Sequence, residues 1–225
     1  ELVREAIGKG LTLEHQAQRI QIRSDEVVWV CAPARLDFAG GWSDTPPYCL
    51  EHGGSVLNAA VKLNGQYPIQ VIGKLHPEPF IKINSIDLGE RIIISAASEM
   101  LSYQDPTNWA ALPKAAFVVT GIITEDTKLD LQDILKELGG GIDLTLFSAV
   151  PSGSGLGMSS ILGSAIIACL SRMLGQEITQ EDLFNRTLYM EQLMTTGGGW
   201  QDQIGGVVGG VKHIQTEPGL FQVPR

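Results

Sequence analysis

The chain has 225 residues, and 44% of them are hydrophobic, which is enough for a substantial core in one large domain or two small ones. Its formal net charge is −9, from 16 Lys and Arg against 25 Asp and Glu, and this balance argues against a nucleic-acid-binding surface. No apolar run reaches the roughly 18 residues of a membrane span, so we expect neither a nucleic acid nor a membrane as partner.

Cysteine usage and the N-terminal sequence indicate the compartment. The 3 cysteines, Cys31, Cys49 and Cys169, are widely separated and include no C-x-x-C pair, which argues against a disulfide framework or a structural zinc site. The N-terminus lacks the basic-then-apolar pattern of a signal peptide. We therefore expect a reducing, cytoplasmic setting.

The first hundred residues are predicted to be mostly β-sheet. A polar helix is predicted over Leu2–Arg23, and residues 1–24 are expected to be a linker or the tail of an upstream region. After it, β-branched or alternating apolar residues indicate strands. These strands are predicted at Val27–Ala32, Ser55–Leu63, Ile69–Leu75, Phe80–Ile86 and Arg91–Ser95.

Helices dominate the second half of the chain. Helices are predicted over Leu112–Ile122, Leu129–Leu138, Met158–Leu174 and from Thr179 to about Thr196, and strands over Ile142–Ala149 and Val207–Ile214. The helix at 158–174 is apolar on nearly every side, so we expect it to be buried in the middle of the domain. The next helix begins with Thr179 followed three residues later by Asp182, which resembles a capping box.

A glycine-rich turn, Pro151-Ser-Gly-Ser-Gly-Leu-Gly-Met-Ser-Ser160, separates a predicted strand from the buried helix. Glycines at alternate positions permit positive φ, so successive backbone N–H groups can face one concavity. The helix N-terminus behind them adds its dipole and its unpaired donors, which favours an anion. The predicted phosphate-binding residues are Pro151, Gly153, Ser154, Gly155, Leu156, Gly157, Met158, Ser159 and Ser160.

The amino-acid sequence of this turn excludes two other kinds of phosphate-binding loop. A Walker loop needs a Gly-Lys-Ser/Thr ending, and the dinucleotide fingerprint needs G-x-G-x-x-G, whereas the spacing here is G-x-G-x-G without a lysine. The alternative is a connection that uses glycine only to turn. Ser159 and Ser160 favour a site, because a hydroxyl in the first helical turn can cap the helix, contact a phosphate or bind Mg²⁺.

Two carboxylates follow in the predicted 179–196 helix and after it. Phe184, Leu188 and Glu191 share one helix face by spacing, and a carboxylate on an apolar face needs a partner or a metal. A salt bridge, or a helix end open to water, would also satisfy Glu191. Asp202 is predicted to lie in a loop bracketed by glycines, where a functional role and a simple turn-forming role are both open.

One more segment carries candidate residues, Ala32-Pro-Ala-Arg-Leu-Asp-Phe-Ala-Gly-Gly-Trp-Ser-Asp-Thr-Pro-Pro47. We predict that it leaves a strand and turns as a loop through Gly40 and Gly41, which places Arg35 before the turn and Asp44 after it. With the glycine-rich turn, it resembles the GHMP family of small-molecule kinases from about Val27 to Arg225, since P-x-x-x-G-L-G-x-S-S is the signature of that family.

The resemblance implies an α+β fold, a mixed sheet packed with helices of the ribosomal protein S5 domain 2-like type, with residues 25–225 as the N-terminal catalytic and ATP-binding lobe. It implies ATP and Mg²⁺ as cofactors, with Ser160 and Glu191 as metal ligands. Asp202 matches the catalytic aspartate, and Arg35 would neutralise charge on the transferred phosphoryl group. Asp44 is expected to bind the sugar, and Gly199 lies in the matching T-T-G-G-G-W-Q-D-Q segment.

Within the family, the segments around Asp44 and Asp202 resemble those of L-fucokinases, which implies transfer of phosphate from ATP to the anomeric hydroxyl of L-fucose in GDP-fucose salvage. Heptose-phosphate kinases share a similar first segment and are the alternative, as is a binding module without turnover. The resemblance further implies a C-terminal lobe beyond Arg225, and an upstream pyrophosphorylase domain would fit it.

Overall fold

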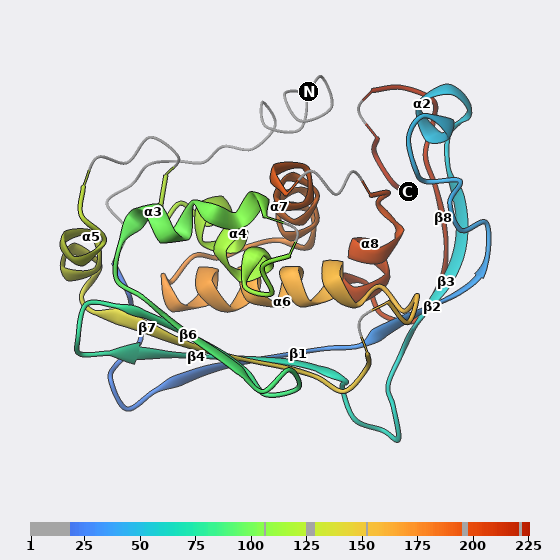
Figure 1. The fold of residues 1–225 in the computed structure, drawn as a ribbon. Helices are drawn as coiled ribbons and strands as arrows, with labels where there is room; N and C mark the ends of the chain where they lie inside the picture. Colours follow the sequence, from blue (N-terminus) through green and yellow to red (C-terminus); the bar gives the residue numbers. More distant parts are fainter. Residues whose placement is uncertain (1–18, 106, 125–128, 152, 195–197, 221) are drawn as a thin grey trace.

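The computed structural model describes residues 19–105, 107–124, 129–151, 153–194, 198–220 and 222–225. A five-stranded sheet forms one layer, and helices cover one of its faces (Figure 1). β5 pairs in parallel with β7, whereas the other neighbours are antiparallel, so this sheet is mixed as predicted. Its strands, in spatial order, are β1 (Val27–Ala32), β4 (Ile69–His76), β7 (Gly141–Ser148), β5 (Ile81–Ser85) and β6 (Glu90–Ile94).

A second, three-stranded antiparallel sheet stands beside the first (Figure 1). Its order is β2 (Ala34–Ala39), β3 (Ser55–Val61) and β8 (Val211–Gln215). The prediction of a loop from residue 32 to 47 was therefore wrong in its first half, because Ala34–Ala39 pairs with β3 as a strand. Arg35 lies on β2, and its backbone N–H donates to the carbonyl of Leu156 in the glycine-rich turn.

The helices pack in two tiers on the larger sheet (Figure 1). α6 lies along the sheet against β1 and β4, and α4 and α7 pack on α6. The helices are α2 (Tyr48–His52), α3 (Ala97–Met100), α4 (Ala111–Val119), α5 (Leu131–Leu138), α6 (Met158–Met173), α7 (Gln180–Leu193) and α8 (Gln201–Val207), with a 3₁₀ turn at Ser102–Gln104. Because both of its faces are covered, α6 is apolar on nearly every side, as predicted.

Alternation along β7 builds the core between sheet and helices. Ile142, Leu144 and Leu146 face inward and are almost fully buried, as their period of two predicts. Burial of one such side chain contributes about 1.5 to 3 kcal/mol. Since β7 leads directly into the glycine-rich turn, this core holds the entry to the turn, and α6 holds its exit.

Three local predictions have different outcomes. The first is confirmed, because Thr179 caps α7 and exchanges hydrogen bonds with Asp182 as a capping box. Asp202 lies in the first turn of α8 and not in a loop. Most of the helix predicted over 2–23 lies outside the described residues; its described end, from residue 19, is not helical, and there Ile20 N–H donates to the carbonyl of Leu138.

In the part of the chain that the structure describes, no helix is long and apolar enough to cross a bilayer.

Candidate active site

A cleft of about 320 Å³ opens where β2, the glycine-rich turn, α7 and α8 meet. Residues from four separate parts of the sequence converge there, because β2 and α8 both contact α6. The cleft is lined by eight of the predicted site residues: Arg35, Asp44, Gly155, Gly157, Ser160, Glu191, Gly199 and Asp202.

The glycine-rich turn has the backbone geometry that its sequence predicts. Gly153, Gly155 and Gly157 have φ of 79°, 73° and 71°, a region that side-chain-bearing residues rarely adopt. Gly157 is the N-cap of α6, so the unpaired N–H groups of the first helical turn begin at this point. A Cβ at Gly157 would lie 3.1 Å from Oδ1 of Asp202, so glycine also permits α8 to approach closely.

Contacts with β2 set the direction of the peptide groups in this turn. Arg35 N–H donates to the carbonyl of Leu156 at 3.1 Å, and the Arg35 guanidinium donates to the carbonyl of Gly155 at 3.1 Å. In a trans peptide the N–H points opposite to the carbonyl. The N–H groups of Leu156 and Gly157 therefore point away from Arg35, as an anion-binding concavity requires. The Leu156 side chain packs against the core, so Leu156 offers only its backbone to the site.

Glu191 is buried in the floor of the cleft and is only 8% exposed. Two neutral side chains hydrogen-bond to its carboxylate: Gln203 Nε2 donates to Oε2 at 2.7 Å, and the Ser160 hydroxyl also bonds to it. The pKa of Glu191 is raised to about 7, mainly by burial; the charges of Asp202 and Asp44 contribute to the rise, and the hydrogen bonds from Ser160 and Gln203 oppose it. Of the alternatives left open by the sequence, a solvated helix end does not describe this buried carboxylate.

Arg35 and Asp202 form an ion pair across the cleft. Nη2 of Arg35 lies 2.6 Å from Oδ1 of Asp202, and the Arg35 side chain is 7% exposed. Burial raises the pKa of Asp202 above its usual value, while the Arg35 charge acts against the rise. A carboxylate with a raised pKa, beside a fixed cation and close to Gly157 of the glycine-rich turn, has the chemistry of a proton acceptor.

Gln201 links the two halves of the cleft, a role that no sequence pattern indicated. Its backbone N–H and its Nε2 donate to the two carboxylate oxygens of Asp44 at 2.9 and 3.0 Å, and its Oε1 accepts from Arg35 at 3.1 Å. Burial raises the pKa of Asp44, and the backbone hydrogen bond from Gln201 counteracts this. Gly199 packs directly on the Asp44 carboxylate, where any Cβ would overlap it.

A second cavity, of about 560 Å³, adjoins the other side of the glycine-rich turn. It is lined by Pro151, Met158 and Ser159, three of the predicted residues that do not reach the first cleft, together with Trp109 and Leu112. Gly153, Ser154 and Leu156 line neither the cleft nor this cavity. The turn thus separates a polar cleft, which contains the carboxylates, from a more apolar cavity.

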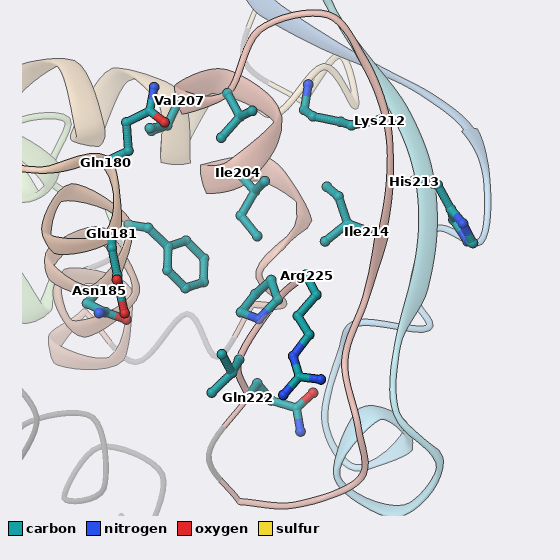
Figure 2. Close-up of a pocket in the computed structure, with 14 residues that line it drawn as sticks. Gln180, Glu181, Asn185, Ile204, Val207, Lys212, His213, Ile214, Gln222 and Arg225 are labelled. Atoms are coloured by element: carbon teal, nitrogen blue, oxygen red, sulfur yellow. The ribbon is translucent and has the colours of Figure 1, made fainter.

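A third cavity, of about 420 Å³, lies between α7, α8, β8 and the segment 222–225 (Figure 2). Figure 2 shows the side chains of Ile204 and Ile214 toward its interior. None of the predicted site residues lines it, and its wall is mainly apolar. The cleft at Asp202, although smaller, is therefore the candidate for chemistry.

The oxygen donors of the cleft can supply part of the coordination shell of Mg²⁺. Among the described residues, no group of three or more His, Cys, Asp or Glu side chains is arranged to hold a metal ion. Mg²⁺ keeps several waters and takes one or two carboxylates plus substrate phosphates, so a full protein cage is not required. The buried Glu191 carboxylate and the Ser160 hydroxyl beside it, both lining the cleft next to Gly155 and Gly157, provide such a partial set.

Comparison with known proteins identifies relatives of this chain. The family model of the GHMP kinases N terminal domain matches residues 127–210. The chain is 42% identical over 227 residues to an L-fucokinase/L-fucose-1-P guanylyltransferase of Bacteroides fragilis, covering 100% of this chain and 24% of that protein. The chain belongs to the GHMP kinase family.

Further relatives of this GHMP kinase chain support the same assignment. A bifunctional fucokinase/GDP-fucose pyrophosphorylase of Arabidopsis thaliana is 36% identical over 216 residues, covering 96% of this chain and 20% of the relative. A crystal structure of a D-glycero-D-manno-heptose 1-phosphate kinase has a TM-score of 0.65 at 22% identity and covers 89% of this chain and 59% of that one. That likeness concerns the fold alone. The chain spans a quarter or less of the length of the two curated relatives.

Proposed function

We propose that this chain carries the ATP-binding and catalytic lobe of a sugar kinase that phosphorylates the anomeric hydroxyl of L-fucose. The observation that carries the proposal is the Arg35–Asp202 pair, which lies beside the glycine-rich turn and lines the cleft of about 320 Å³. A binding module needs no base beside its phosphate turn. The identity to two fucokinases over nearly the whole chain supports L-fucose as the acceptor.

In this reaction the chain's residues position groups and neutralise charge. The N–H groups of the turn would bind the phosphates of ATP. The oxygen of the anomeric hydroxyl would form a bond to the γ-phosphorus while the bond between that phosphorus and the bridging oxygen of ADP breaks. Asp202 would accept the proton of this hydroxyl. Arg35 would neutralise the charge that gathers on the phosphoryl group. Asp44, held by Gln201, would accept hydrogen bonds from sugar hydroxyls.

Ser160 and Glu191 would hold Mg²⁺, which when bound neutralises phosphate charge. Buried and flanked by neutral hydrogen-bond donors, Glu191 is held in a fixed orientation in the absence of the ion. We further propose a cytoplasmic setting. The names of the two relatives join a fucokinase to a guanylyltransferase or pyrophosphorylase, so we also propose that such a domain occurs in the same polypeptide.

Sugar-dependent ADP release from Mg·ATP tests the proposed function. We expect release with L-fucose, and little with D-galactose or a heptose 7-phosphate. Preference for the heptose phosphate would favour the alternative kinase, although Arg35 is the only Lys, Arg or His among the described residues that line the cleft. Binding of Mg·ATP without release with any of the three sugars would contradict the kinase assignment for this chain.

We expect the adenine base of ATP to lie in the 560 Å³ cavity, where Trp109 offers an aromatic wall beside Pro151 and Ser159. Replacing Trp109 by Ala should raise the KM for ATP about tenfold and leave the KM for the sugar unchanged. Steady-state kinetics with each substrate varied in turn measures this. A rise in the sugar KM alone would place the base elsewhere, and a thermal unfolding curve checks that the variant folds.

Gln201 offers a prediction about the acceptor side. Gln201→Glu keeps the backbone donor and the acceptor for Arg35, but it brings a second carboxylate against Asp44 in place of the Nε2 donor. We expect the KM for the sugar to rise about tenfold or more, because Asp44 loses a donor and gains a like charge. The matched control is Gln132→Glu on the exposed face of α5. Equal kinetics in both variants would contradict the positioning role of Gln201.

A further inference from the structure

Asp37, on β2, lines the cleft of about 320 Å³ and lies at an irregularity in its strand. The pairing of β2 with β3 shifts register between Asp37 and Ala39, and such bulges re-aim side chains next to active sites. The Asp37 side chain lines the cleft, remains 30% exposed, and has Oδ2 at 3.9 Å from Nη1 of Arg35. A Cβ at Gly41 would overlap this carboxylate, so glycine lets the following turn close upon it. Asp37 is therefore held at the cleft with its carboxylate accessible.

Trp42, in that turn, is both strained and exposed. Its φ is 74°, in the left-handed region that a bulky residue avoids, and its side chain is 80% exposed although it lines the cleft. Hydrogen bonds hold the turn in this shape: Ser43 N–H donates to the carbonyl of Gly40, and Thr45 N–H donates to that of Trp42, each at 3.1 Å. An indole that is 80% exposed adds little to packing in the free protein, so fold stability does not account for a strained tryptophan here.

We propose that Asp37 and Trp42 form the edge of the cleft that recognises the sugar. Carboxylate oxygens accept hydrogen bonds from hydroxyl groups, and an indole ring covers the apolar C–H face of a sugar ring. The ligand class is a monosaccharide that has one apolar face, and L-fucose, with a methyl group where many hexoses have a hydroxymethyl group, belongs to it. This inference rests on the proposed sugar-kinase function and adds which residues select the acceptor.

The test combines kinetics, direct sugar binding and thermal stability. Trp42→Gly should raise the KM for L-fucose about tenfold, leave the KM for ATP unchanged, and leave the melting temperature equal or higher, because glycine tolerates positive φ. Trp42→Phe should retain most of the affinity. Asp37→Asn should raise the sugar KM about tenfold or more through loss of a charged acceptor.

The chain offers matched controls for these variants. Trp29, which is 62% exposed on β1, lies outside the cleft, and Asp25 is an exposed aspartate ahead of the same strand. Trp29→Gly and Asp25→Asn should leave the sugar KM unchanged. Titration of tryptophan fluorescence with L-fucose should give a change in the wild-type chain that Trp42→Phe largely removes.

The other possible results distinguish failure of the proposed function from failure of the sugar-recognition inference. If the wild-type chain neither releases ADP with any sugar nor changes fluorescence with L-fucose, the proposed function fails, and the recognition edge fails with it. If the wild-type chain turns over fucose but Trp42→Gly and Asp37→Asn keep its sugar KM, the function stands and this inference is wrong. A lower melting temperature in Trp42→Gly, with both KM values raised together, would show that Trp42 serves the fold.

Discussion

Replacing Asp202 by Asn should lower kcat for sugar phosphorylation by about two to four powers of ten. The asparagine keeps the size of the side chain and an oxygen that can face Arg35, whose Nη2 lies 2.6 Å from Oδ1 in the native pair. It cannot accept the proton of the sugar hydroxyl. Because binding contacts are retained, the KM values for ATP and sugar should change by much less than kcat.

The measurement is single-turnover and steady-state ADP release in the presence of saturating Mg·ATP and L-fucose. Asp133→Asn is a suitable control, since Asp133 forms an exposed pair with Lys136 on α5, away from the cleft. Turnover in Asp202→Asn within a few-fold of the wild-type value would remove Asp202 from the role of base. A fall confined to the KM values would instead assign Asp202 to substrate binding.

The parts of the fold that sequence predicted are those that local chemistry determines. Alternation placed Ile142, Leu144 and Leu146 inward on β7, and the Thr179–Asp182 box began α7 at the expected residue. The glycine-rich turn was predicted with its positive φ values, because only glycine adopts them without strain. In the site, the meeting of Arg35, Glu191 and Asp202 in one cleft was expected from the family resemblance.

The errors occurred where distant contacts determine the local structure. The prolines and glycines after Ala32 indicated a loop, so the sequence did not predict β2. This strand forms because Ala34–Ala39 pairs with β3. The glycines at 205 and 206 indicated a loop, yet they belong to α8. There they allow close approach, since a Cβ at Gly205 would overlap the Arg35 side chain and one at Gly206 would overlap Ile161. The contact of Gln201 with Asp44 joins residues 157 positions apart, and no local pattern carries it.

Glu191 should make the stability of the metal-free chain fall as pH rises toward neutrality. Burial raises its pKa from 4.5 to about 7, so the folded state holds a proton that the unfolded state has lost between these values. The stabilisation is complete below pH about 4.5 and is lost as pH rises through about 7. The shift corresponds to about 3 kcal/mol of unfolding free energy.

Urea unfolding in EDTA at a series of pH values, for the wild type and Glu191→Gln, measures this contribution. Asp44 and Asp202 also have raised pKa values, mainly through burial, and give a similar trend, but they are present in both chains. The difference between the two curves therefore measures Glu191 together with its electrostatic coupling to these two carboxylates. The glutamine variant should lose less stability between pH 4.5 and 7.5, and parallel curves would contradict the raised pKa. Since a cation favours the ionised carboxylate, added Mg·ATP should stabilise the wild type more at pH 7.5 than at pH 5.5, and this pH dependence should weaken in Glu191→Gln.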